Sequence, residues 1–289
     1  GVLLVAGCDN GVYKGLYEID SDLPEPPKIV VVGDMNHDGT NDLLFGVRAC
    51  ERDDAGQIID FDDCQYRTQL MTWQPALDRF TNLLPDTALS KNPADVTDFD
   101  KDEVSEVVVR LESNGTSATG PLRTGVNVYD WDGESYLLSI VQLDPPRYRI
   151  QIIQEADRLS ARRDWANAIS VYQLALSGGD TLRYWYDDEP EALRSYTLYR
   201  LLIAQIASSD VGLPQTQQQL ATLYPDPVTA PVYISMAQTF LTDFQTSGDV
   251  HSACQQVRAI ISSRPEALDL LNRYGTRNPR YTAQDLCSF

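Results

Sequence analysis

Two short acidic segments, each running directly into an apolar stretch, constrain this chain more than any other feature. Residues 34–42 have the sequence DMNHDGTND and precede LLF, whereas residues 98–106 have the sequence DFDKDEVSE and precede VVV. In both segments side-chain oxygens stand at positions one, three, five and nine. This spacing suits a hard cation such as Ca²⁺, which takes six to eight oxygen ligands, and the apolar residues that follow predict a strand. The sequence therefore predicts two cation-binding loops that each open a strand.

The alternatives are an EF-hand and a pair of solvated polar turns. An EF-hand requires a bidentate Glu at loop position twelve and a helix on each side. Position twelve is Phe45 in the first segment and Val109 in the second, and the flanking residues favour strands. We therefore reject the EF-hand, and the matching register of the two segments favours cation binding over solvated turns.

The negative charge is concentrated in the first half of the chain. The 289 residues carry a formal net charge of −19 and are 43% hydrophobic, which is enough for folded cores. Residues 1–146 contain 27 acidic and 10 basic side chains, while residues 147–289 contain 15 and 13. The acidic half favours cation binding and excludes nucleic acid as a partner, because phosphates would be repelled.

Residues 29–143 are predicted to form an all-β domain, because short runs of β-branched and aromatic residues alternate with turn signals. The expected strands are Ile29–Val32, Asp42–Ala49, Thr68–Trp73, Glu106–Leu111, Val126–Trp131 and Tyr136–Val141. Each acidic segment is followed by a strand that contains Trp and then by another aromatic residue. This pattern indicates two repeated units.

Residues 147–289 are predicted to form a helical domain, so the fold class is α+β. Asp144-Pro145-Pro146 marks the boundary, because prolines end a strand and can open a helix. Beyond it the apolar residues recur with helical spacing, in helix pairs over 147–177, 190–224 and 230–263. Two architectures stay open, a small array of αα-hairpins or one irregular bundle.

The five cysteines predict two disulfides and one separate thiol. Cys50 and Cys64 stand across a polar segment between two expected strands, in hairpin geometry. Cys254 lies on an expected helix, and a bridge to Cys287 would fix the C-terminal segment. Free buried thiols are the alternative, and the absence of Cys-x-x-Cys spacing argues against zinc. Disulfides favour an oxidising, extracytoplasmic location at the cell surface.

Residues 1–28 form a separate N-terminal segment. The stretch GVLLVAGCD, in which small residues precede a Cys, resembles a bacterial lipobox. In this interpretation Cys8 carries a lipid that anchors the protein to a membrane, and residues 1–7 are the end of a signal peptide. The alternative is a first strand, Val2–Ala6, that turns at Asn10-Gly11 into a hairpin.

The acidic segments and their strands resemble the FG-GAP/VCBS repeat family. The resemblance covers 29–143 and rests on residues 30–46 and 95–109. It implies that each loop joins two strands of a blade-like unit and holds Ca²⁺, which gives two calcium sites. Two units are too few for a closed propeller, so we expect a compact domain of two blade-like units, either as a sandwich or completed by a partner.

The resemblance also implies the ligands of each loop. They are Asp34, Asn36, Asp38 and Asp42 with the carbonyl of Thr40, and Asp98, Asp100, Asp102 and Glu106 with the carbonyl of Val104. The second loop departs from the pattern, because Glu103 stands where the first has Gly39, at a position that often requires positive φ. We therefore expect the first loop to be the more secure site.

The helical half resembles tetratricopeptide (TPR) hairpins at residues 164–172, DWANAISVY, which implies a face that binds a protein partner. Together with the lipobox-like start and the calcium loops, it resembles exported bacterial lipoproteins. We therefore expect a non-enzymatic, calcium-binding scaffold that is a lipid-anchored subunit of a surface or membrane assembly.

Signals for catalysis are weak. His37 and His251 lie in no catalytic motif, and no nucleophile-elbow, P-loop or zinc-protease pattern occurs. Two alternatives stay open. Paired carboxylates could serve a glycan hydrolase, and Trp73, Trp131 or the 184–186 aromatic group could be the stacking platforms of a carbohydrate-binding module.

Overall fold

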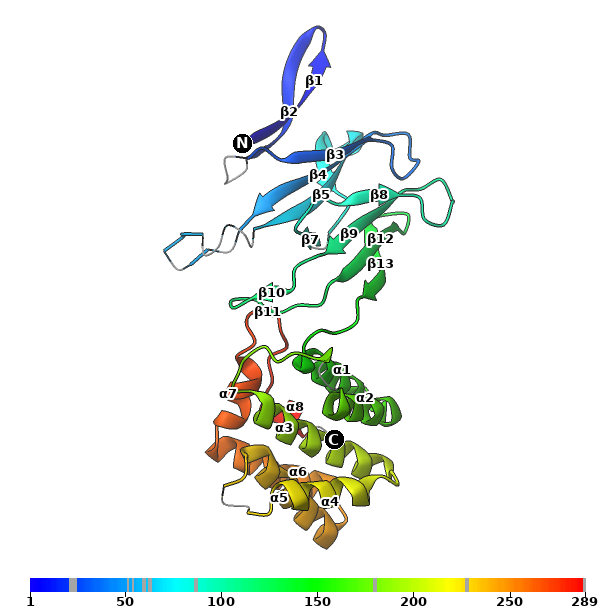
Figure 1. Ribbon diagram of the computed structural model, residues 1–289. Helices are drawn as coiled ribbons and strands as arrows, with labels where there is room; N and C mark the ends of the chain where they lie inside the picture. The colour runs from blue at the N-terminus through cyan, green and yellow to red at the C-terminus, as the bar shows by residue number, and fades with distance from the viewer. Residues whose placement is uncertain are drawn as a thin grey trace. The chain divides into compact units, whose positions relative to one another are not determined.

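A computed structural model describes residues 1–20, 25–50, 52, 53, 55–58, 61, 64–85, 88–178, 181–226 and 229–287. The chain divides into two compact units (Figure 1). The sheet unit comprises residues 1–114 and 123–144, and the helical unit comprises residues 115–122 and 145–289. Residues 21–24 of the expected N-terminal segment, and six of the residues between Cys50 and Cys64, lie outside the described residues. The fold is mixed, with antiparallel sheets first and helices after them.

The strands of the sheet unit are β1 (Val2–Asp9), β2 (Val12–Asp20), β3 (Lys28–Gly33), β4 (Asp42–Ala49), β5 (Gln65–Gln74), β6 (Arg79–Asn82), β7 (Ala88–Ser90), β8 (Asp95–Thr97), β9 (Glu106–Leu111), β12 (Gly125–Trp131) and β13 (Tyr136–Leu143). The six predicted strands correspond to β3, β4, β5, β9, β12 and β13. The sequence does not predict β6, β7 and β8, because three or four residues are too few for a clear alternation.

Two antiparallel sheets repeat one plan. One has the strand order β3-β4-β5-β6, with β7 also paired to β5, and the other has the order β8-β9-β12-β13. In each sheet an acidic segment joins the first strand to the second. In each, a Trp of the third strand contacts an aromatic residue of the fourth, with ring centroids 5.3 Å apart for both Trp73–Phe80 and Trp131–Tyr136. The repeat predicted from the sequence is therefore present in the strand order.

The two sheets bury one common core. Five of its members are at most 3% exposed, namely Leu44, Leu70, Val107, Val109 and Tyr129. Backbone hydrogen bonds also join the two sheets, because Leu83 N–H donates to the Leu70 carbonyl and Tyr136 N–H donates to the Leu83 carbonyl. The two acidic segments are therefore carried on one packed body.

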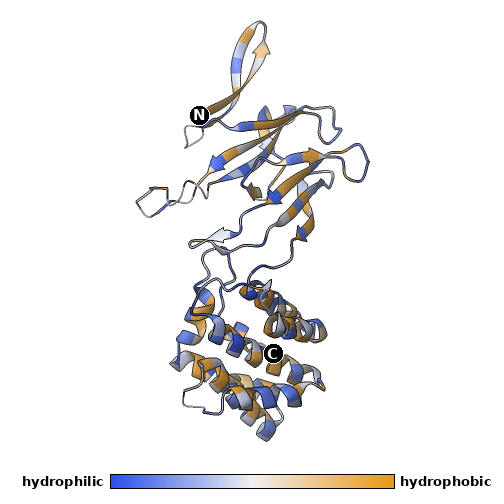
Figure 2. Ribbon diagram, in the orientation of Figure 1, coloured by the Kyte–Doolittle hydropathy of each residue, from blue (hydrophilic) through white to orange (hydrophobic). Residues whose placement is uncertain are grey.

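The N-terminal residues form a hairpin of β1 and β2. Asn10 and Gly11 at its turn have φ of 51° and 80°, as a type I′ turn requires. Leu3 and Val5 pack against the buried residues of β4 and β5. Figure 2 shows apolar residues along the hairpin. The structure thus contains the first-strand alternative, while Cys8 is an exposed free thiol on β1 and its lipid stays a prediction.

The helices are α1 (Arg149–Ala161), α2 (Trp165–Ser177), α3 (Pro190–Ser208), α4 (Leu213–Leu223), α5 (Val232–Ser247), α6 (Val250–Ser263), α7 (Glu266–Asn272) and α8 (Ala283–Leu286). The three predicted pairs correspond to α1–α2, α3–α4 and α5–α6. Their core is rich in aromatic side chains, including the fully buried Tyr196, Tyr199 and Phe240. In the part of the chain that the structure describes, no helix has the length and apolarity to cross a bilayer.

A short hairpin, β10 (Gly115–Thr116) and β11 (Gly120–Pro121), corrects the expected domain boundary. We predicted it within the β domain, but it belongs to the helical unit. The carbonyl of Thr119 accepts hydrogen bonds from the Asn278 side chain and the Arg277 N–H. Gly120, at φ 76°, approaches Tyr274 so closely that a Cβ would lie 1.4 Å from its carbonyl oxygen. These long-range contacts leave no local signal in the sequence.

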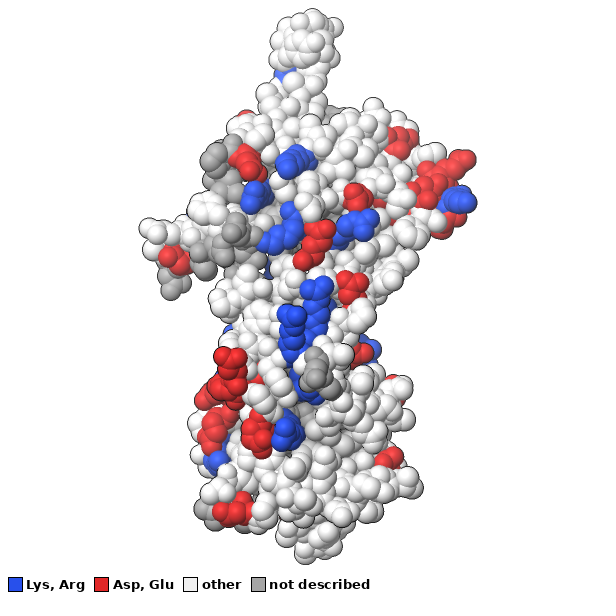
Figure 3. Space-filling view, in the orientation of Figure 1, with Lys and Arg blue, Asp and Glu red and all other residues white. Residues whose placement is uncertain are grey.

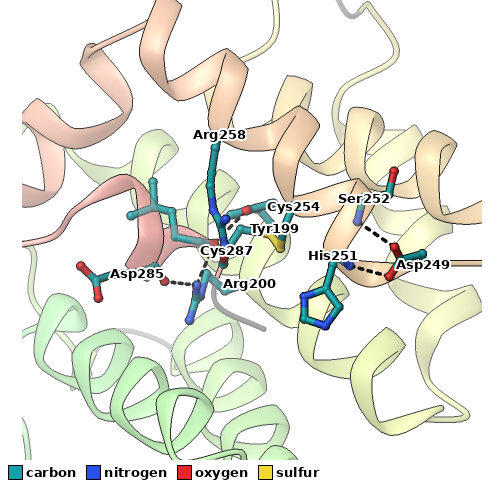
Figure 4. The surroundings of a disulfide bond; sticks show 10 residues. Tyr199, Arg200, Asp249, His251, Ser252, Cys254, Arg258, Asp285 and Cys287 are labelled. Atoms are coloured by element: carbon teal, nitrogen blue, oxygen red, sulfur yellow. Dashed lines mark hydrogen bonds between the residues drawn. A yellow bond between two sulfur atoms is a disulfide. The ribbon is translucent and has the colours of Figure 1, made fainter.

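Both predicted disulfides, Cys50–Cys64 and Cys254–Cys287, are present. The second fixes the C-terminal segment against α3 and α6 (Figure 4). There Arg200 donates to the carbonyl of Leu286, and Arg258 donates to the carbonyl of Cys287. Two disulfides indicate an oxidising, extracytoplasmic location.

Candidate metal centre

The two acidic loops have residues with positive φ at the same two positions. At position four, His37 and Lys101 have φ of 57° and 65°. At position six, Gly39 and Glu103 have φ of 84° and 74°. The positive φ expected at position six is therefore present in both loops, and in the second it is borne by a residue with a Cβ, which strains the backbone.

The carboxylate at position nine closes each loop. Asp42 Oδ2 accepts a hydrogen bond from Met35 N–H at 3.1 Å, and Glu106 Oε2 accepts one from Phe99 N–H. Asp42 is 0% exposed and Glu106 is 3% exposed. The second oxygen of each, Asp42 Oδ1 and Glu106 Oε1, is buried without a hydrogen-bond partner. A buried carboxylate oxygen in that state is costly, and a cation is the partner that would relieve the cost.

Four carboxylates converge in the second loop. Ligand oxygens of Asp98, Asp100, Asp102 and Glu106 all lie within 4.8 Å of one another. Within the described residues this is the one group of acidic, His or Cys side chains so arranged. The first three are exposed, so the group opens to solvent where the loop between β8 and β9 projects (Figure 3). An acidic group of this kind could hold a metal ion, and oxygen ligands suit a hard cation.

The first loop uses its oxygens differently. Asp34 accepts hydrogen bonds from the N–H groups of Asp38 at 3.0 Å and Gly39 at 2.9 Å. Asn36 accepts a longer bond from Asp38 N–H at 3.3 Å. Its acidic side chains do not form a converging group like that of the second loop. An ion at Asp34, Asn36, Asp38 and Asp42 stays a prediction.

The predicted carbonyl ligands stand at position seven of each loop, two residues after the acidic residue at position five. Thr40 N–H donates to Asp38 Oδ1 at 2.7 Å, and Val104 N–H donates to Asp102 Oδ1 at 2.9 Å. The matching bonds place Thr40 and Val104 at equivalent points of the two loops. Binding of an ion by their carbonyls stays a prediction.

Burial and neighbouring charges act together on the position-nine carboxylates. Burial raises the pKa of Glu106, and the negative charges of Asp100 and Asp130 add to the rise that the Phe99 N–H partly offsets. Burial likewise raises the pKa of Asp42, and the nearby Thr72 hydroxyl and the Met35 N–H partly offset that rise. A bound cation would favour the charged form of both.

Tyr136 is buried near the position-nine carboxylates of both loops. It is 0% exposed, and its hydroxyl has no hydrogen-bond partner. Burial raises its pKa, and the charges of Asp42 and Glu106 raise it further. The loops are also joined directly, because Ser105 N–H donates to the Met35 carbonyl at 2.9 Å. The sequence analysis did not predict that this ring lies near both carboxylates. The available signal was that Tyr136 stands where the first repeat has Phe80.

A buried polar cluster of the helical unit has a structural role. Asp157 accepts hydrogen bonds from the hydroxyls of Tyr172, Tyr196 and Tyr281 and pairs with Arg200 at 3.1 Å. These donors occupy both carboxylate oxygens, and Arg200 is 4% exposed. The cluster joins α1, α2 and α3 to the C-terminal segment and leaves no free carboxylate for acid–base chemistry.

The aromatic residues considered as stacking platforms pack within the protein. Trp185 contacts Tyr148 at 4.9 Å, and Tyr186 contacts Tyr274 at 5.7 Å between ring centroids. The Arg273 guanidinium lies 4.4 Å from the centre of the Tyr186 ring. Because Trp73 and Trp131 are paired across strands, these rings are already engaged in intramolecular contacts.

Comparison with protein-family models, with curated proteins and with solved structures found no match in any of the three.

Proposed function

We propose that this protein is a non-enzymatic, extracytoplasmic scaffold that binds Ca²⁺ in the loop of residues 98–106. The observation that carries the proposal is the convergence of four carboxylates within 4.8 Å. Two unit charges at that separation repel by about 0.9 kcal/mol in bulk water, and four carboxylates make six pairs. Summed over the six pairs, this repulsion is roughly 5 kcal/mol, and a divalent cation would relieve it.

Calcium fits this loop better than other common cations do. The group contains only oxygen ligands, whereas Zn²⁺ takes mostly His and Cys. Mg²⁺ demands near-ideal octahedral geometry and keeps several waters, while Ca²⁺ accepts a flexible shell. We propose Val104 as a carbonyl ligand of the same ion. We propose loop 34–42 as a second and weaker site, because Asn36 there replaces a carboxylate.

We propose that the two sheets are blade-like units of the FG-GAP/VCBS type. The support is their common plan of four antiparallel strands, with an acidic loop between the first and the second. We propose equally that the helix pairs are TPR-like hairpins that bind a protein partner. A groove of about 490 Å³ on α5 and α6, lined by polar side chains such as Thr239, Asp243 and Gln256, supports this part of the proposal.

Thermal unfolding with and without calcium tests the metal proposal. At a calcium concentration one hundred times Kd, binding adds about 2.7 kcal/mol to the free energy of unfolding. For a chain of 289 residues that is a rise in Tm of roughly 4–5 °C. Asp98→Asn should reduce the rise, because it removes one charge from the group. EDTA should reverse it in the wild-type protein.

Asp34→Asn is the matched control, because it changes the same position in the other loop. If the second loop is the main site, this variant keeps most of the calcium-induced rise in Tm. Titration calorimetry then counts the ions bound by each variant. A rise that survives Asp98→Asn unchanged but disappears in Asp34→Asn would move the site to the first loop, and no rise in any protein would refute calcium binding.

The mass of the natural mature N-terminus tests anchoring at Cys8. A lipid on Cys8 requires removal of residues 1–7, which would take Leu3 and Val5 away from the buried residues of β4 and β5. The packing favours retention of β1, whereas the lipobox-like sequence favours cleavage. A mature chain that begins at a modified Cys8 would establish the anchor.

A further inference from the structure

Position two of the acidic loops is used in opposite ways. Met35 in the first loop is 3% exposed and belongs to the core shared by the two sheets. Phe99, at the same position of the second loop, is 64% exposed. Both residues donate their N–H to the carboxylate at position nine, so the backbones correspond while the side chains point to different environments. The loop conformation therefore does not require an exposed aromatic at this position.

The exposed ring is linked directly to the metal group. Phe99 stands between Asp98 and Asp100, two of the four converging carboxylates, and its N–H is held by a third, Glu106. An ion that fixes these side chains fixes the backbone on both sides of the ring. Before binding, mutual repulsion of the carboxylates disfavours that arrangement. Calcium would therefore order the residue that carries the ring.

Charge indicates what such a ring could contact. The four carboxylates carry −4, and the neighbouring Lys101 and Glu103 cancel each other. A bound Ca²⁺ leaves the loop at −2. An anionic membrane or an acidic protein surface is therefore repelled even by the loaded loop, whereas a basic surface is attracted.

We propose that calcium binding presents Phe99 as an anchor for an apolar pocket with a basic rim on a partner protein. This inference rests on the proposed calcium site. It assigns the second loop to recognition and the first to the core. Burial of the ring in such a pocket would strengthen binding roughly tenfold to a hundredfold.

Retention on phenyl-agarose tests the presentation of the ring. The full chain is applied in calcium or in EDTA, as wild type, as Phe99→Ser and as Phe61→Ser. Phe61 is the matched control, because it is 63% exposed and lies outside both acidic loops. We expect calcium to increase retention of the wild type and of Phe61→Ser, and not of Phe99→Ser. An equal calcium effect in all three proteins would overturn the proposal.

A second pair of resins tests the basic rim. Phenyl groups are offered beside amines or beside carboxylates, and the retention that depends on both calcium and Phe99 is compared. We expect it to be at least tenfold larger beside amines. Calcium-dependent sedimentation with phosphatidylserine vesicles that is lost in Phe99→Ser would overturn the protein partner in favour of a membrane.

The calcium-induced rise in Tm separates this inference from the proposed function. Phe99→Ser keeps the backbone N–H that Glu106 accepts, so its rise in Tm should equal that of the wild type. If that rise is present and the resin results are negative, only the role of Phe99 fails. If the wild type shows no rise in Tm, the calcium site itself fails.

Discussion

Replacement of Glu103 by glycine should stabilise the sheet unit. Glu103 has φ of 74°, in the left-handed region, where a residue with a Cβ is disfavoured by about 1–2 kcal/mol. Glycine removes this strain, but it adds about 0.4–1 kcal/mol of conformational entropy to the unfolded chain. With the midpoints of these two ranges, the expected net rise in the free energy of unfolding is about 0.8 kcal/mol.

Two further variants separate the backbone from the charge. Glu103→Gln keeps the Cβ and removes the negative charge, so the difference between the Gly and Gln variants reports the backbone alone. Gly39→Gln makes the opposite change at the same position of the first loop. A Cβ there would meet no atom within 4 Å, and the φ is 84°, so strain without a clash should lower stability by a similar amount.

Calorimetric unfolding of the full chain in EDTA measures these differences without a contribution from bound metal. We expect Glu103→Gly to be more stable than Glu103→Gln. At position 39 we expect the wild type, which has glycine there, to be more stable than Gly39→Gln. Equal unfolding free energies for Glu103→Gly and Glu103→Gln would refute the argument from left-handed strain. Tolerance of Gly39→Gln without loss would refute it independently.

Three other perturbations concern the helical unit. Arg200→Met should lower the free energy of unfolding in urea by about 3–5 kcal/mol, because it leaves the Asp157 carboxylate buried without its cation. Replacement of Cys254 and Cys287 by Ser should cost about 3.7 kcal/mol in the same assay, since the bridge closes a long loop. Burial raises the pKa of Glu189, so the folded state holds this proton to higher pH than the unfolded chain does. Stability from this group should therefore fall as pH rises through the raised pKa, and Glu189→Gln should flatten that part of a pH series of unfolding curves.

The sequence predicts those parts of the structure whose signal is local. β4 begins at Asp42 and β9 at Glu106, where each acidic segment meets apolar residues. The helix pairs follow from apolar spacing, and Cys50–Cys64 follows from its place across a polar segment. In each case the residues that determine the feature are close together in the chain, so the pattern is sufficient.

Features formed by distant residues could not be predicted in this way. Asp157 and Tyr281 meet across 124 positions, and Asn278 binds Thr119 across 159 positions. The candidate site shows the same limit at shorter range. Both loops have the predicted spacing, but the direction of each side chain depends on which N–H groups it accepts, and Asp34 is engaged by two of them. The glycine at position six therefore favoured the first loop, while the carboxylates converge in the second.

The contrast between the loops follows from their different surroundings on one packed body. In the first loop, Met35 enters the core, and its carbonyl holds the N–H of Ser105, the residue before Glu106. The first loop, which Met35 anchors in the core, thus holds the backbone of the second loop directly before Glu106. The second loop has no core residue at position two, and the side chain of Phe99 faces solvent there. The first loop is fixed by packing in the core. Its contacts with the second loop offset the loss of stability that repulsion among the four carboxylates causes, so the second loop can carry that group of charges.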